Sequence, residues 1–445
     1  DTSRESETMT VTVKVFDTYY HTPPLIGDEI KGVATEDNFG RAVSLSEDGT
    51  KMAVGAPQDD DGGVESGSVR VYQYSGGSWS LFGNQINGAS AGDKAGSSVS
   101  LSGDGTILAM GLPYRSSNTG EVRTFKYNSG TANWDLIGTI SITNVPSGSN
   151  KAVSEQFGND VRLSSDGKTL AVSDIWFDRS GGINSGRVVV YRYDGTNWNS
   201  LGNATALYGE TGDNFSWGLS LSANGNIMAI GAHENDEAAS KAGQVKIYEY
   251  DLPNTEWDLK ATLLGDSAND RFGSSLDLNS NGLTIAIGST GDKKASGGFS
   301  YQGSVNIFKW DGNTNTYANL GSELWGESLL SYFGAQVSLD NEGNTLAVME
   351  PGYGTNRDKG RVKVYNYNTG TSTWDQSPTS YNFDGEEDDN QSKGSLDESK
   401  GQRVFLSGDG SVLAIGADLN DGNGADSGHV KVHRLFDVQD IPVAD

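Results

Sequence analysis

The sequence contains no cysteine, only nine prolines and only four histidines among its 445 residues. The lack of cysteine excludes disulfide bonds, thiolate metal sites and a cysteine nucleophile. The low proline content excludes a proline-rich stalk. No apolar run approaches the roughly 20 residues that a membrane-spanning helix requires. These absences leave a turn-rich chain, with 60 glycines, that we expect not to cross a membrane.

Positive charge is also scarce, since 32 Lys and Arg stand against 59 Asp and Glu for a formal net charge of −27. Nucleic-acid binding gains most of its affinity when Lys and Arg neutralise phosphates, so DNA and RNA are excluded as partners. Cations, basic proteins and neutral glycans are left as partners. Alternatively, the acidity serves only to keep an exposed protein soluble.

Catalytic motifs are missing as well. The histidines His21, His233, His429 and His433 form no H-E-x-x-H pair, and no G-x-S-x-G segment accompanies them. No glycine-rich phosphate loop leads from a strand into a helix. We therefore expect no enzyme activity and no cofactor. A glycan-active enzyme stays open as an alternative, because paired catalytic carboxylates leave no local motif.

The sequence does contain one motif that is repeated seven times. Each copy has an alternating strand, a tight turn, an apolar strand ending near glycine, a variable loop, a third strand and a fourth that usually opens with Trp. The copies begin near Phe39, Ala95, Phe157, Phe215, Phe272, Phe333 and Lys400. Four short strands per repeat predict an all-β fold, a seven-bladed β-propeller of four-stranded antiparallel blades that forms a single domain over residues 1–445.

The pieces of the repeat have separate physical roles. An Asp-Gly or Asn-Gly pair in most copies, such as Asp48-Gly49, supplies the positive φ that a tight hairpin needs between the first two strands. The second strands are apolar on both faces, with alanine at the centre of every copy, so we expect them to pack between blades. The repeated Trp residues cap the outer edge of each blade in our interpretation; the alternative is a ring of sugar-stacking aromatics.

The two chain ends predict how the ring closes. Residues 13–32 match residues 69–88 at a constant offset, so the N-terminal segment 1–32 holds a third and a fourth strand without the first two. The last repeat lacks a clear fourth strand, and an N-terminal strand should complete its blade. One third strand is then surplus, either Thr10–Phe16 or His429–Leu435, and could pair with another chain.

The phrase Phe39-Gly40, followed by Gly55-Ala56-Pro57, resembles the FG-GAP repeat of integrin α-subunit propellers. The resemblance implies an extracellular, ligand-binding or adhesive propeller. It also implies calcium loops between the first two strands, but here those loops have shrunk to hairpins with too few oxygens for calcium. We therefore expect no calcium there.

Acidic loops gather on the opposite face of the predicted ring. Those expected to contact a partner include Asp59, Asp60, Asp61, Glu234, Asp236 and Glu237, and the acidic inter-blade loop 384–400 belongs to the same face. The nearest approach to a calcium loop is 418–426, where the candidate ligands are Asp418, Asn420, Asp421 and Asp426. Its glycine comes one place early for an EF-hand, and a solvated acidic loop is the alternative.

These features together predict a non-enzymatic extracellular module for adhesion or protein–protein assembly, with a carbohydrate-binding propeller as the alternative. A first residue other than Met is consistent with a removed signal peptide and a secreted protein. Candidate N-glycosylation sites occur at Asn203, Asn214 and Asn390.

Overall fold

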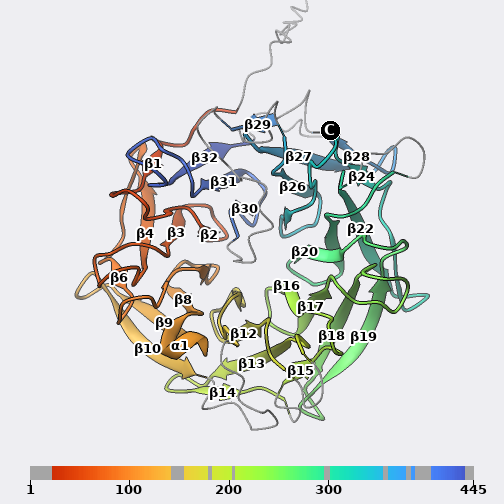
Figure 1. Ribbon diagram of the computed structural model, residues 1–445, viewed down its shortest axis with the longest axis horizontal. Coiled ribbons are helices and arrows are strands. Elements are labelled where there is room, and N and C mark those ends of the chain that lie inside the picture. Colours follow the sequence, from red (N-terminus) through yellow and green to blue (C-terminus); the bar gives the residue numbers. More distant parts are fainter. Residues whose placement is uncertain are drawn as a thin grey trace, which may run out of the picture.

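The computed structural model describes residues 23–141, 155–178, 183–202, 206–294, 301–353, 359–376, 382–385 and 402–435. Seven antiparallel sheets stand in a ring, with the first strand of each nearest the axis (Figure 1). The predicted seven-bladed propeller is confirmed. No helix among the described residues is long and apolar enough to span a membrane.

The strands run from the axis outward in chain order. The first blade consists of β2 (Ala42–Leu45), β3 (Lys51–Ala56), β4 (Ser68–Ser75), β5 (Ser78–Leu81) and the short β6 (Ile86–Asn87). The second consists of β7 (Ser98–Leu101), β8 (Ile107–Leu112), β9 (Glu121–Asn128) and β10 (Asn133–Ser141), with the helical turn α1 (Arg115–Asn118) between β8 and β9. The third consists of β11 (Val161–Leu163), β12 (Thr169–Asp174), β13 (Arg187–Tyr193), β14 (Trp198–Ser200) and β15 (Leu207–Tyr208).

The remaining blades follow the same plan. The fourth consists of β16 (Phe215–Leu221), β17 (Ile227–Ala232), β18 (Gln244–Asp251) and β19 (Glu256–Leu264). The fifth consists of β20 (Phe272–Leu278), β21 (Thr284–Ser289), β22 (Ser304–Asp311), β23 (Thr316–Asn319) and β24 (Leu324–Trp325). The sixth consists of β25 (Gln336–Leu339), β26 (Thr345–Glu350), β27 (Arg361–Asn368), β28 (Thr373–Gln376) and β29 (Asn382–Asp384).

The seventh blade joins the two ends of the described chain. It consists of β30 (Val404–Leu406), β31 (Val412–Ala417), β32 (His429–Arg434) and the N-terminal β1 (Ile30–Lys31). Strand β1 pairs antiparallel with β32, with Ile30 opposite Val430. The predicted closure is therefore confirmed, and His429–Leu435 supplies the third strand of this blade. The other candidate for a surplus strand, Thr10–Phe16, lies outside the described residues, as do Lys400 and most of the acidic loop 384–400.

Apolar second strands form the core between blades, as expected. The alanine at the centre of each second strand has no exposed surface in any of the seven blades (Ala53, Ala109, Ala171, Ala229, Ala286, Ala347 and Ala414). Neighbouring backbones also approach closely: a Cβ atom on Gly55 would lie 2.0 Å from the carbonyl oxygen of Gly96 in the next blade. Glycine is required at such contacts because any side chain would push the blades apart.

The repeated tryptophans join neighbouring blades. The indole N–H of Trp134 donates to the carbonyl oxygen of Phe82 at 2.8 Å, and that of Trp374 donates to Leu320 at the same distance. Both rings are buried, with 5% and 6% of their surface exposed. Trp134 and Trp374 are therefore structural, since a buried ring cannot stack against a sugar.

Candidate functional site

A cavity of about 630 Å³ lies where the seven blades meet. Its walls come from the first strands, the loops before them and the segments at the ends of the second strands, and all seven blades contribute. Residues from the first-to-second-strand hairpins do not line it among the described parts of the chain. The variable face predicted from the sequence is thus where the cavity opens, although its most distinctive residues are not the predicted acidic ones.

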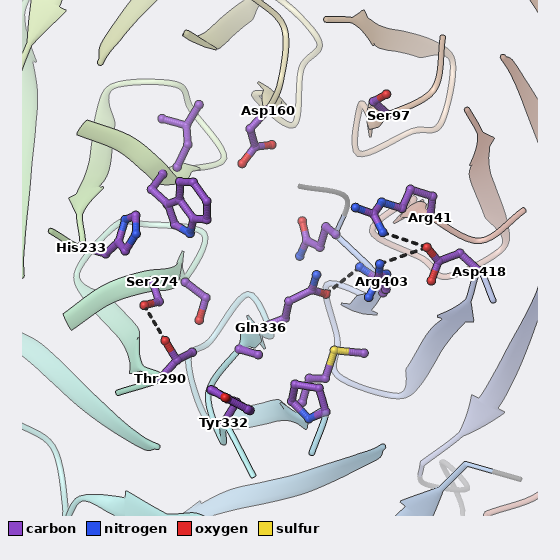
Figure 2. A pocket seen from close by; sticks show the side chains of 18 of the residues that line it. Arg41, Ser97, Asp160, His233, Ser274, Thr290, Tyr332, Gln336, Arg403 and Asp418 are labelled. Carbon is purple, nitrogen blue, oxygen red and sulfur yellow. Dashed lines mark hydrogen bonds and ion pairs between the residues drawn. The ribbon is translucent and has the colours of Figure 1, made fainter. Parts of the chain in front are cut away.

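Two arginines and one aspartate form a group of ion pairs in the wall (Figure 2). Asp418 Oδ2 lies 2.9 Å from Arg41 Nη1 and 3.0 Å from Arg403 Nη2, and only 1% of the Asp418 side chain is exposed. Burial alone would raise the pKa of Asp418, but the positive charges of Arg403 and Arg41 outweigh it and hold this pKa below its usual value. The trio is therefore a stable ionic group with one more positive than negative charge.

Arg162, on β11, reaches across the ring. Its Nη1 donates to the side-chain oxygen of Gln402, which precedes β30 in the seventh blade, while its Nη2 contacts Asp160 Oδ2 at 3.2 Å. Its Nε donates to the carbonyl oxygen of Leu219 at 2.9 Å. Three contacts hold the guanidinium in one position, so a bridge between the third and seventh blades forms part of the cavity wall.

Arg162 interrupts a regular ring of serines on the inner strands. In four blades a serine at this position accepts the backbone N–H of the next blade's first strand at 3.0 Å (Ser44, Ser100, Ser220 and Ser338). The fifth blade has Asp277 instead, which accepts Leu339 N–H at 2.9 Å. Burial raises the pKa of Asp277, although hydrogen bonds and the charge of Arg162 oppose the effect. Arg162 and Asp277 are thus charged residues at a position where four of the blades have serine.

Aromatic residues make up another side of the cavity. The rings of Trp217 and His233 lie 4.3 Å apart, and Trp176, Tyr114 and Tyr332 also line the space. Figure 2 shows His233, Tyr332, Asp160 and Arg403 around the same opening. Aromatic rings of this kind suit the C–H face of a sugar or another small cyclic molecule.

The backbone beside Trp217 is unusual. Ser216 has a φ of 80°, whereas the equivalent positions Gly40 and Gly96 are glycines with φ of 93° and 84°. Its contact partner is also changed, because Ser173 stands where Gly55 stands in the first blade. The Ser216 hydroxyl is buried and has no hydrogen-bond partner. Such a strained residue costs about 1–3 kcal/mol and is typical of functional sites.

A second group of carboxylates lies in the fifth blade, around Asp292 in the loop after β21. Asp292 accepts a hydrogen bond from Ser304 Oγ at 2.8 Å. Burial, followed by repulsion from Asp292, raises the pKa of Asp270 to about 7. Burial also raises the pKa of Glu323 to about 7, with further repulsion from Asp292 and Asp266. This acidic group therefore retains protons well above the usual range of a carboxylic acid.

The structure places the predicted partner-face residues mostly in loop-stabilising contacts. Asp59 is buried and accepts from Arg70 Nη2 at 2.7 Å. Asp60, Asp236 and Glu237 accept hydrogen bonds within their own loops or blade, while Asp61 lies 3.8 Å from Arg70. Of the six predicted residues, Glu234 alone lines the cavity.

The predicted calcium ligands are not brought together as one site. Asp418 is held by two arginines, whereas Asn420 and Asp421 accept backbone N–H groups of Gly422 and Asp426 at 2.8 Å. Asp426 lines the cavity. Within the described ranges, no group of three or more His, Asp or Glu side chains is arranged to hold a metal. Calcium at this loop stays a prediction, as does the expectation that the chain needs no cofactor.

The three glycosylation candidates differ in what the structure describes. Asn203 and Asn390 lie outside the described residues. Asn214 is only 8% exposed and borders the cavity. A buried side chain is a poor acceptor for a glycan, so the structure does not favour modification there.

The cavity residues that sequence analysis missed are Asp160, Arg162, Trp217, Arg41 and Arg403. A signal existed for two of them. Arg162 replaces the serine seen in other copies, and Trp217 follows a serine that replaces a glycine. Comparing the copies with one another at these positions would have revealed both.

Comparisons with known proteins agree with the fold. A family profile described as the FG-GAP repeat matches residues 31–72. No curated protein matches the sequence. A periplasmic gluconolactonase from Pseudomonas aeruginosa is similar at 16% identity and a TM-score of 0.50, over 75% of this chain and 83% of its own.

Two Bacteroides structures show the same likeness. A candidate 6-phosphogluconolactonase from Bacteroides uniformis has 13% identity and a TM-score of 0.53, over 80% of this chain and 88% of its own. One from Bacteroides fragilis has 15% identity and a TM-score of 0.50, over 77% of this chain and 84% of its own. At such identity the likeness shows the fold.

These comparisons correct two expectations from the sequence. The chain was expected to be a non-enzymatic adhesion or assembly module, yet the solved propellers that resemble it are described as lactonases. The expectation that it is not an enzyme is overturned by the same finding. The family resemblance is supported: an FG-GAP repeat matches residues 31–72, and the chain forms a seven-bladed ring.

Proposed function

We propose that the chain is a hydrolase that opens the ring ester of a small sugar-derived lactone in the central cavity. The observation that carries this proposal is the set of Asp160, His233, Arg41 and Arg403 around one opening (Figure 2). The lactonases that share the fold add support. A cavity of about 630 Å³ is large enough for such a substrate.

Lactone hydrolysis adds water to the carbonyl carbon and breaks the bond from that carbon to the ring oxygen. A base must take a proton from the water, and positive charge must stabilise the oxyanion that forms. In this proposal the Asp160 carboxylate is the base, oriented by its 3.2 Å contact with Arg162. Arg41 and Arg403, fixed by Asp418, supply the positive charge.

The leaving ring oxygen then needs a proton. His233 is the candidate donor, because its ring lies against Trp217 at the cavity wall. The product is an open-chain hydroxy acid, and the water oxygen ends in its carboxylate. No bond to the protein forms at any stage, so each protein group acts by position, charge or proton transfer.

For location, we propose the periplasm or the exterior of the cell. The similar gluconolactonase from Pseudomonas aeruginosa is described as periplasmic. The absence of cysteine neither favours nor opposes this placement, because a large ring can be stable without disulfides.

The test is the hydrolysis of glucono-δ-lactone, measured by acid release with a pH indicator and compared with the spontaneous rate. The protein should exceed that rate, and Asp160→Asn should lower kcat by about 10²–10⁴-fold, because the base is lost while size is kept. Asp258→Asn, at an exposed position on β19, is the matched control and should leave kcat unchanged. Equal rates with and without protein, across several sugar lactones, would contradict the proposal.

A further inference from the structure

Basic side chains in the cavity wall all have acidic partners. Five such residues line the described part of the wall: Arg41, Lys94, Arg162, Arg271 and Arg403. Their contacts are Arg41 and Arg403 with Asp418 at 2.9 and 3.0 Å, Arg162 with Asp160 at 3.2 Å, Lys94 with Glu65 at 3.5 Å and Arg271 with Glu234 at 3.8 Å. Each basic side chain in the wall therefore has an acidic neighbour, although Arg41 and Arg403 share Asp418.

The total charge leads to the same conclusion. Five acidic residues line the described wall as well: Glu36, Asp160, Glu234, Asp418 and Asp426. Formal charges in the wall thus cancel, within a protein whose net charge is −27. A site for a phosphate group normally presents arginine or lysine in excess, often in bidentate contact. That excess is absent from the described wall.

From this balance we infer that the cavity selects neutral lactones and rejects phosphorylated ones. This inference rests on the hydrolase function proposed above and specifies its substrate class. A phosphate monoester would bring close to two negative charges into the cavity. Accepting it would require breaking an existing ion pair and leaving a carboxylate beside the phosphate, which should lower the affinity by about 100-fold.

Neutral hydrogen-bonding groups suit the inferred substrate. Ser274 Oγ and Thr290 Oγ1 lie 3.0 Å apart on the cavity wall (Figure 2). The side chain of Gln336 lines the cavity and accepts the backbone N–H of Arg403 at 2.6 Å. Hydroxyl and amide groups of this kind can exchange hydrogen bonds with the hydroxyls of a sugar without any change in charge.

The first experiment compares glucono-δ-lactone with 6-phosphoglucono-δ-lactone. The value of kcat/KM should be higher for the neutral compound by about 100-fold. Raising the salt concentration from about 0.05 to 0.5 M should change the KM for the neutral lactone by less than about twofold, because salt hardly screens the binding of an uncharged molecule. Equal or faster hydrolysis of the phosphorylated lactone would overturn the inference while leaving the hydrolase function intact.

A binding measurement separates the inference from the hydrolase proposal. Calorimetry with glucose and glucose 6-phosphate needs no turnover, so it applies even if no lactone is hydrolysed. Glucose should bind more tightly than its phosphate. Tighter or equal binding of glucose 6-phosphate, or binding of neither compound, would overturn the inference.

One substitution should shift the selectivity in a known direction. Glu234→Gln removes the acidic partner that Arg271 shares with Lys241, and it leaves the positive charge of Arg271 in the wall without that partner. The ratio of kcat/KM for the neutral lactone to kcat/KM for the phosphorylated lactone should then fall by about tenfold. Glu256→Gln, at an exposed position on β19, changes the net charge equally and should leave the preference unaltered. An unchanged preference in Glu234→Gln would contradict the role given to charge pairing.

Discussion

The two ends of the propeller use aspartate in opposite ways. At the hairpin end, Asp104 follows the first strand of its blade and accepts hydrogen bonds from Ser102 Oγ at 2.7 Å and Thr106 N at 2.9 Å. Burial raises the pKa of Asp104, but these hydrogen bonds outweigh it and the pKa lies below its usual value. At the cavity end, burial and neighbouring carboxylates raise the pKa of Asp270 to about 7.

The difference separates scaffold from site. The hairpin arrangement recurs in other blades, for instance around Asp48 and Asp409, because every blade needs the same turn. The cavity end is irregular, since each blade contributes different residues to one shared space. Repetition therefore marks what holds the ring together, and departures from repetition mark where chemistry can occur.

The largest expected effect on stability is at Asp418. Asp418→Asn removes a buried negative charge between the buried Arg41 and the half-buried Arg403, and breaking such a group costs about 3–5 kcal/mol of unfolding free energy. Urea unfolding measures the loss. Asp421→Asn in the same loop keeps a side-chain oxygen for Asp426 N–H and should change stability by less than about 0.5 kcal/mol. Equal losses in both variants would show that the cavity end is no more sensitive than an ordinary loop.

The next effect is a dependence of stability on pH. Asp270 and Glu323, both with a pKa of about 7 in the folded protein, keep protons that the unfolded chain releases near pH 4. The folded state therefore binds more protons between pH 4 and 7, and stability falls as pH rises across this window. After allowance for screening by solvent, the loss should be about 1–2 kcal/mol.

Thermal unfolding at several pH values measures this slope. The double variant Asp270→Asn with Glu323→Gln should flatten it, because neither amide titrates. A wild-type protein that gains stability from pH 4 to 7, or a double variant with the same slope as the wild type, would contradict the assignment.

The smallest effect is at the hairpin end. Asp104→Ala removes hydrogen bonds from an exposed turn and should cost about 1 kcal/mol in urea unfolding. Because the folded pKa of Asp104 is lowered, its contribution is present above pH 4 and is lost as pH falls further. Lactone hydrolysis should be unchanged. A large loss of hydrolysis would mean that the two ends are not independent.

The sequence was sufficient to predict the repeated features. Seven blades, the hairpins, the buried alanines and closure by the N-terminal segment all follow from patterns that recur along the chain or match between its ends. The cavity was not predictable in this way. Arg162 and Gln402 are 240 positions apart, and their contact exists only because the ring brings opposite blades together.

The acidic loops were also expected to contact a partner, in line with the resemblance to adhesive propellers. Their carboxylates are largely engaged in stabilising the loops themselves, as Asp59 is with Arg70. Charge read from sequence does not distinguish an ion pair inside a loop from a surface offered to a partner. Only the positions of the partners in space make that distinction.

The contact between Arg162 and Gln402 has a consequence for the width of the cavity. Arg162 belongs to the third blade and Gln402 precedes the first strand of the seventh, so the contact joins blades that are not neighbours in the ring. Contacts between adjacent blades alone would leave the centre of the ring free to widen, whereas a hydrogen bond across the centre opposes that movement. A substrate would therefore meet walls whose separation is set before it binds.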